Sequence, residues 1–232
     1  MKKYDVVYFL KPDEVNNEAR WSLRSIEKNM DHGAVWFYGG QPSELIPDRR
    51  APMIQSDRQT KWQRVREMLA AACENDEITQ KFWLMNDDFF VLQKMESEGP
   101  YFGGDLRSHI LSIEYRHGRI TPYTAELRAC EAMLEEAGLP TFNYALHIPM
   151  LIDRKKMAAA IRAFPGCPMF RSIYGNYAEI GGSCHEDVKV LGQNELIPET
   201  ADFASTTDDS FGYGAAGAQI RAMFPYKCRY EI

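Results

Sequence analysis

Two adjacent carboxylates interrupt an apolar stretch of this chain, and that pattern limits the structures the stretch can form. Asp87 and Asp88 follow one apolar run, residues 82–85, and precede another, residues 89–92. Short apolar runs rich in aromatic residues are typical of buried strands. Burying an unpaired carboxylate costs free energy, and two neighbouring carboxylates also repel each other. The pair therefore predicts either a turn, where Asn and Asp are common, or a divalent cation, which prefers carboxylate oxygens.

Strand and helix patterns alternate along the chain, which predicts an α/β fold with a mixed sheet flanked by helices. Strands are expected over residues 4–10, 34–40 and 53–56 and in the apolar runs on either side of the aspartates, and helices over residues 18–28, 59–74 and 123–137. A further strand runs into a helix over residues 149–164, and residues 93–122 show no clear pattern. No composition shift or repeat divides the chain, so a single domain is expected.

The ends of the first strands place polar residues at one edge of the predicted sheet. The first strand ends near Lys11, the second at Gly39-Gly40, and the aspartates follow a third. In open α/β sheets, ligands bind in the crevice at the carboxyl ends of the strands. This placement favours the metal over the plain turn.

Composition excludes few functions but indicates a compartment. The 232 residues are 45% hydrophobic and 26% charged, with a net charge of −6, which gives nucleic-acid binding no support from overall charge. The five cysteines are scattered without metal-site spacing, as is typical of reduced thiols. No apolar run has the length of a signal peptide or a membrane span, so a cytoplasmic protein is expected.

Four segments in order resemble the Stealth family of sugar-phosphate transferases. They are NNEARWSLRSIEKN with the following GGQP, FWLMNDDFF, LPTFNYALHIPMLIDRKKM and FPYKCRYE. The family's first strand ends in Trp-Val-Asp-Gly, where this chain has FLKPDE, so Asp13 or Glu14 would supply the acidic position. The chain is also compact compared with many members.

The resemblance implies a fold similar to GT-A glycosyltransferases, a nucleotide-sugar donor and a bound Mg²⁺ or Mn²⁺. A UDP-sugar is the expected donor. The acceptor is expected to be a hydroxyl group, of a glycan rather than of a modified DNA base. The single domain over residues 1–232 would divide into a nucleotide- and metal-binding half, residues 1–92, and an acceptor and catalytic half, residues 93–232.

The acidic pair is the predicted metal site. Asp87 and Asp88 would hold the cation that screens the diphosphate, and Asp88 would also take part in catalysis. Asn86 would orient the pair or serve as an ordinary turn residue.

Arginines are the predicted phosphate ligands, because the guanidinium group binds phosphate oxygens in a bidentate manner. Arg20 and Arg24 lie one turn apart on the first helix, where a solvated helix face is the alternative. The family resemblance suggests Arg171 as a further phosphate ligand, and a surface cation is the alternative there.

His147 is the predicted general base. It lies between apolar neighbours just before a proline, and a histidine held in this way can accept the proton of an acceptor hydroxyl. A buried structural histidine is the alternative. Further candidates are Asn176, His185 beside two acids, and the pair Asp208 and Asp209, which could instead cap a helix.

These residues together predict a metal-dependent transferase that moves a sugar or a sugar-1-phosphate from a nucleotide-sugar onto an acceptor hydroxyl. Two alternatives stay open at this point. In a nucleotide-sugar hydrolase, water replaces the acceptor. In a carbohydrate-binding module without catalysis, the aromatic residues, 12% of the chain, stack on sugars.

Overall fold

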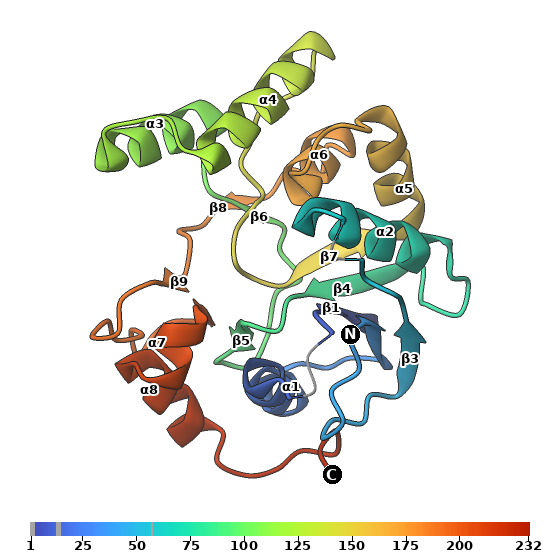
Figure 1. The fold of residues 1–232 in the computed structure, drawn as a ribbon, viewed down its shortest axis with the longest axis vertical. Coiled ribbons are helices and arrows are strands. Elements are labelled where there is room, and N and C mark those ends of the chain that lie inside the picture. The colour runs from blue at the N-terminus through green and yellow to red at the C-terminus, as the bar shows by residue number, and fades with distance from the viewer. Residues whose placement is uncertain (1–2, 13–14, 57) are drawn as a thin grey trace.

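A five-stranded sheet forms the centre of the computed structural model, which describes residues 3–12, 15–56 and 58–232 (Figure 1). Its strand order is β3-β2-β1-β4-β7, and only β7 runs antiparallel to its neighbour. The strands are β1 (Asp5–Leu10), β2 (Val35–Gly39), β3 (Arg49–Pro52), β4 (Lys81–Met85) and β7 (Met150–Asp153). The predicted mixed sheet flanked by helices is therefore confirmed.

Helices cover both faces of this sheet because its inner strands are apolar on both sides. Val7 of β1 faces the cluster formed with α2 (Lys61–Glu74), α5 (Arg154–Ala163) and α6 (Phe170–Tyr177). Val6 and Tyr8 face the opposite cluster, which contains Leu23 and Ile26 of α1 (Asn17–Asn29). The alternation along β1 follows from the two-residue period of a strand.

A second, smaller sheet lies beside the first and forms a third apolar cluster. Its order is β5-β10-β9, with β5 (Phe89–Val91), β10 (Phe203–Thr206) and β9 (Lys189–Val190). The helices α7 (Asp208–Gly212) and α8 (Ala215–Met223) cover it, and Phe90 stacks on Phe211 with ring centroids 5.7 Å apart. Because β4 and β5 are separated only by residues 86–88, the acidic turn joins the two sheets.

The remaining elements extend from the body of the molecule. The helices α3 (Leu106–His117) and α4 (Pro122–Glu136) form a hairpin that projects at the top of Figure 1. The strands β6 (Tyr101–Phe102) and β8 (Ser183–Cys184) form a two-stranded sheet near its base. None of the helices in the described ranges is long and apolar enough to cross a membrane.

One expected strand is misplaced, and one helix lies where no element was predicted. The strand expected over residues 53–56 lies instead at Arg49–Pro52, an edge strand that begins with two arginines and is mostly exposed, so it forms no apolar run. The helix α3 lies in the segment that showed no pattern, because only Leu106, Ile110 and Ile113 of it are buried. Its ends did carry signals, since Asp105 caps it and Gly118 ends it in the left-handed region at φ 63°.

A buried ion pair ties the C-terminus to α1. Arg24 donates from Nε and Nη2 to the two oxygens of Glu231, at 2.7 and 2.8 Å, and from Nη1 to the carbonyl of Phe224 at 2.9 Å. The side chains of Arg24 and Glu231 are only 8% and 2% exposed. The Trp21 ring also lies 4.4 Å from the guanidinium carbon of Arg24.

Replacing Glu231 by Ala is expected to lower the free energy of unfolding by about 3 kcal/mol, because the Arg24 charge then stays buried without its carboxylate. Urea unfolding measures the change. Asp31→Ala, which breaks the exposed Lys3–Asp31 pair, is the matched control and is expected to change stability little. A Glu231→Ala effect as small as the control would contradict a stabilising role for the buried pair.

Candidate functional site

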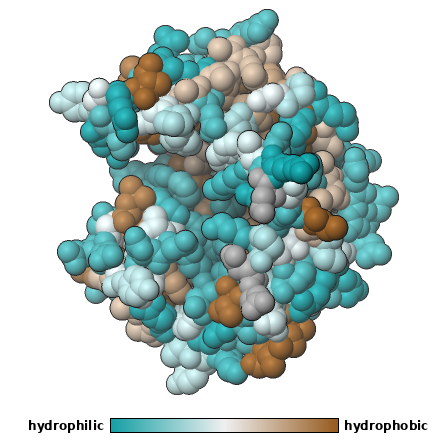
Figure 2. All heavy atoms as spheres, viewed as in Figure 1, coloured by the Kyte–Doolittle hydropathy of each residue, from teal (hydrophilic) through white to brown (hydrophobic). Residues whose placement is uncertain are grey.

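A cleft of about 700 Å³ lies at the carboxyl ends of β1 and β4, where the sequence placed the site. Its charged lining residues are Lys11, Glu18, Lys61, Arg64, Asp87, Asp88, Lys189, Asp208 and Asp209, and it also contains Asn86 and His147. The volume suits a small-molecule ligand. Figure 2 shows a face of the molecule that is hollowed between the α3–α4 hairpin and the lobe of α7 and α8.

The turn at residues 86–88 brings the acidic pair into the cleft. Asp87 accepts a hydrogen bond from Asn16 Nδ2 at 2.9 Å, and the other side-chain atom of that amide, Oδ1, accepts from the Ala19 backbone N–H to cap α1. Burial raises the pKa of Asp87, and the neighbouring charge of Asp88 raises it further. The carboxylates thus lie in a turn and at the end of a buried strand, so the turn and the metal hypotheses both fit the backbone.

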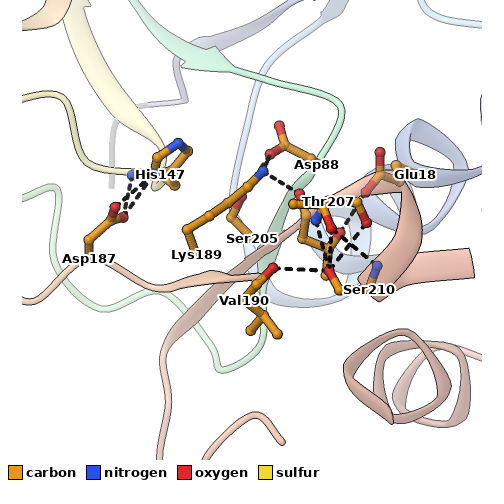
Figure 3. A network of polar contacts seen from close by, with 10 residues as sticks. Glu18, Asp88, His147, Asp187, Lys189, Val190, Ser205, Thr207 and Ser210 are labelled. Carbon is orange, nitrogen blue, oxygen red and sulfur yellow. Dashed lines mark hydrogen bonds and ion pairs between the residues drawn. The ribbon is translucent and has the colours of Figure 1, made fainter. Parts of the chain in front are cut away.

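Asp88 is held by residues of the second sheet. Its Oδ2 accepts from Lys189 Nζ at 2.5 Å and from Ser205 Oγ at 2.7 Å, and its backbone carbonyl accepts from the Thr206 N–H at 3.3 Å. Figure 3 shows the Lys189 side chain reaching across to the carboxylate. Sequence reasoning missed Lys189 and Ser205, because both lie more than a hundred residues from Asp88 in the chain.

Glu18 is a third acidic residue of the site that sequence reasoning missed. It lies in the first turn of α1, and one of its oxygens accepts from Thr206 Oγ1 at 2.6 Å. Burial raises the pKa of Glu18 to about 8, and the charges of Asp88, Asp87 and Asp208 act in the same direction. Glu18 therefore holds a proton at neutral pH. In the sequence it looks like any acidic residue at a helix start.

His147 forms a dyad with Asp187 at another part of the cleft. Its Nδ1 lies 2.9 Å from both carboxylate oxygens of Asp187, and its backbone N–H donates to the same carboxylate at 3.1 Å. Burial raises the pKa of Asp187, but the hydrogen bond and charge of His147 outweigh it and leave the pKa below its usual range. No described residue makes a hydrogen bond to Nε2, so that nitrogen is free to accept a proton from a ligand.

Arg171 braces the segment that carries His147. Its guanidinium donates to the carbonyls of Ile148 at 2.7 Å and Leu146 at 3.4 Å, which flank His147, and to that of Leu84 at 3.3 Å. It also lies 5.0 Å from the Phe89 ring centroid, and that ring meets the imidazole edge to face. Burial lowers the pKa of Arg171 to about 10. Arg171 does not line the cleft, so it is not placed to bind a phosphate there.

Other predicted site residues also lie outside the cleft. Arg24 is occupied by Glu231, and Arg20 lies near Glu44 and Glu231 at 3.7 and 3.8 Å. Asn176 is 1% exposed and bonds to the backbone of Phe142 and Ser172. His185 is half-buried, with its ring 5.3 Å from that of Tyr101. Asp13 and Glu14 lie outside the described residues.

The second acidic pair lies in the cleft, and the expectation that one of its aspartates caps a helix is wrong. Asp208 and Asp209 line the cleft, and they also form the first turn of α7. Thr207, not an aspartate, caps that helix, since its hydroxyl accepts from the Ser210 N–H. Negative charge at a helix N-terminus is favourable, so the pair stabilises α7 while facing the cleft.

A divalent cation fits the acidic turn only together with a ligand. In the parts of the chain that the structure describes, no three His, Cys, Asp or Glu side chains are grouped to hold one ion. Asp87 and Asp88 each keep one carboxylate oxygen, Oδ1, without a hydrogen-bond partner among the described residues. Mg²⁺ is commonly held by one or two carboxylates plus substrate phosphates, so two carboxylate oxygens beside a bound diphosphate are a suitable donor set.

Two other cavities lack this chemistry. One of about 370 Å³ lies between β7 and α6 and is lined by Tyr101, Tyr144 and Tyr174 among others. Another of about 570 Å³ lies beside α2 and α4 and includes Trp62. No aspartate or histidine occurs among the described residues that line either one.

No protein-family model matches the chain, and no curated protein sequence matches it. Among solved structures, the chain is similar to the glycosyltransferase GlyE of Streptococcus pneumoniae TIGR4, with a TM-score of 0.40 and 11% identity. The similarity covers 97% of this chain and 52% of that one, so this chain spans about half the length of GlyE. A similarity this distant carries no argument about the reaction, and the Stealth and GT-A resemblances stay predictions.

Glu18 is expected to make stability depend on pH. Its pKa rises from 4.5 to about 8 in the folded chain, which therefore keeps a proton that the unfolded chain releases between those values. The free energy of unfolding then falls as pH rises from about 5 to about 8. In Glu18→Gln this fall should be smaller, by on the order of 2 kcal/mol. Urea unfolding across that interval tests it, with Glu199→Gln as an exposed control, and equal falls in all three proteins would contradict the raised pKa.

Proposed function

We propose that the protein is a transferase that uses a nucleotide-sugar donor and an acceptor hydroxyl, and that the cleft is its active site. One observation carries the proposal: a single cleft contains both the acidic turn of Asp87 and Asp88 and a histidine whose Nδ1 is held by a carboxylate. Neutralising a diphosphate and removing a hydroxyl proton are the two tasks of such a transfer. The cleft offers a group for each.

The acidic turn is the proposed place of the donor's diphosphate. Asp87 and Asp88 would hold Mg²⁺ or Mn²⁺ together with the phosphate oxygens of the donor. When bound, the cation supplies charge that screens the phosphates and stabilises the leaving group. Before a cation binds, Glu18 keeps its proton at neutral pH, so it adds no negative charge beside the two aspartates and can donate a hydrogen bond.

His147 is the proposed general base. Its Nε2 accepts the proton of the acceptor hydroxyl while the hydroxyl oxygen forms the new bond. Asp187 keeps the other nitrogen, Nδ1, protonated and orients the ring, and it stabilises the imidazolium that forms. Arg171 fixes the backbone on both sides of the histidine.

The atom attacked decides which group moves. Attack on the anomeric carbon breaks its bond to the diphosphate, transfers the sugar and releases a nucleoside diphosphate. Attack on the β-phosphorus breaks the bond to the bridging oxygen, transfers the sugar-1-phosphate and releases a nucleoside monophosphate. The released nucleotide therefore identifies the reaction. A UDP-sugar and a glycan hydroxyl are the proposed substrates.

Calorimetric titration with UDP, GDP and CDP tests the donor site. We expect one of these nucleotides to bind in Mg²⁺ or Mn²⁺ and to bind more weakly in EDTA. Asp87→Asn should weaken metal-dependent binding by about 10- to 100-fold, because it removes a ligand charge. Asp88→Asn is expected to have the same effect, provided that urea unfolding shows it to be folded like the wild type.

The exposed variant Asp202→Asn is the control for this titration. Absence of nucleotide binding in every metal condition would contradict the transferase proposal. Binding followed by release of free sugar without an acceptor would instead identify a hydrolase.

His147→Gln is expected to reduce kcat about 100- to 10,000-fold while nucleotide affinity changes little, because the base acts on the acceptor. Asp187→Asn should cause a smaller loss. The double variant should be no slower than His147→Gln alone, since Asp187 acts through the imidazole. The rate of nucleotide release from a donor and an acceptor on which the wild type is active gives kcat. Additive losses in the double variant would contradict the dyad.

A further inference from the structure

We propose that Lys189 is the side chain that binds the diphosphate of the donor. The inference rests on the proposed donor and assigns to the chain a phosphate-binding cation of its own, separate from any metal. The arginines predicted for this role, Arg20, Arg24 and Arg171, do not line the cleft. Four cationic residues line the cleft among those the structure describes, and their surroundings differ.

Lys189 is the cation of the cleft that is held at the acidic turn. Its side chain is 19% exposed, and its ammonium lies 2.5 Å from Asp88 Oδ2. It also donates to the carbonyl of Thr206. By contrast, Lys61 is exposed, with its ammonium 5.3 Å from the Trp62 ring centroid, and Arg64 is on the same helix, α2. Lys11 is exposed at the end of β1.

The hydrogen-bonding capacity of Lys189 is not exhausted. An ammonium group carries three N–H donors. Two acceptors, Asp88 Oδ2 and the Thr206 carbonyl, are the hydrogen-bond partners of Nζ among the described residues. One donor is therefore left for a ligand in the cleft that Lys189 lines. Figure 3 shows Lys189, Asp88 and Ser205 close together. His147 and Asp187 form a separate pair to the left of them in the same view.

The charges around the turn favour a protein cation beside the phosphates. A diphosphate that approaches Asp87 and Asp88 meets two carboxylates, which repel it. Lys189 neutralises Asp88 before the ligand arrives, and its remaining donor gives the phosphate a charge-assisted hydrogen bond. Because Asp88 and Thr206 already fix the ammonium, little side-chain entropy is lost when the phosphate binds.

The test compares Lys189→Met with the matched control Lys61→Met, a second lysine of the same cleft. Calorimetry measures the binding of UDP and of uridine, each with Mg²⁺ and with EDTA. If the wild type binds another nucleoside diphosphate instead, that nucleotide and its nucleoside are used. We expect Lys189→Met to weaken diphosphate binding by about 10- to 100-fold and uridine binding by less than about threefold. Lys189→Arg, which keeps the charge, should recover part of the loss, and Lys61→Met should change both affinities little.

Equal losses for the nucleotide and the nucleoside would overturn the inference, because they would show a general disturbance of the cleft. An equal effect of Lys61→Met would also overturn it, since overall charge would then explain the binding. If the wild type binds no nucleoside diphosphate, both this inference and the proposed function fail. If the wild type binds and Lys189→Met binds as well, only the inference fails.

A second measurement uses the wild-type chain, in case Lys189→Met does not fold. Reductive methylation is followed residue by residue by mass spectrometry, with and without inorganic pyrophosphate. We expect pyrophosphate to slow methylation of Lys189 at least about fivefold and to leave Lys61 unchanged, because a phosphate-bound amine is shielded. Equal protection of both lysines, or of neither, would contradict the assignment.

Discussion

The interactions of Asp88 connect the two sheets and thereby place the whole candidate site. The residue follows β4 of the first sheet, while its side chain binds Lys189 and Ser205 of the second. A carboxylate that is 9% exposed needs such partners, because burial without them is costly. The same contacts that satisfy it bring β9 and β10 to the carboxyl edge of the first sheet. The contacts of this one buried carboxylate therefore help to form the cleft, together with the pairing of β5 and β10.

The cleft holds more acidic than basic groups, and protonation reduces the imbalance. Among the described lining residues are five carboxyl groups and four lysine or arginine side chains. Glu18 keeps its proton at neutral pH because burial and its acidic neighbours raise its pKa to about 8. A raised pKa of this kind marks candidate functional sites but also occurs in structural networks. Here the raised pKa of Glu18 comes partly from the charges of Asp87 and Asp88. A cation bound to these two carboxylates, with a phosphate as its further ligand, would reduce their mutual repulsion.

The sequence predicted the elements whose patterns are local and missed what depends on distant contacts. The apolar runs beside Asp87 and the helix over residues 59–74 were readable from periodicity, and His147 from its apolar and proline neighbours. Lys189 looked like an ordinary surface charge, and Asp187 like a neighbour of His185, because their partners lie 101 and 40 residues away. Arg24 resembled a phosphate ligand for the same reason, since Glu231 is 207 residues distant. Charge pairing across the fold, not the local pattern, separates a structural cation from a binding one.

The arginines and the lysine of this molecule illustrate that separation. Arg24 and Arg171 use several donors of the planar guanidinium on a carboxylate and on backbone carbonyls, which fixes the neighbouring chain. Arg171 in particular holds the carbonyls on both sides of His147, so its effect on a reaction would be through the position of the imidazole. Two acceptors anchor Lys189, and no other residue of the described ranges accepts from its third N–H. A cation that is fixed beside the acidic turn and lines the cleft is suited to an anionic ligand. A guanidinium that binds backbone carbonyls or a buried carboxylate away from the cleft is suited to holding the protein that surrounds it.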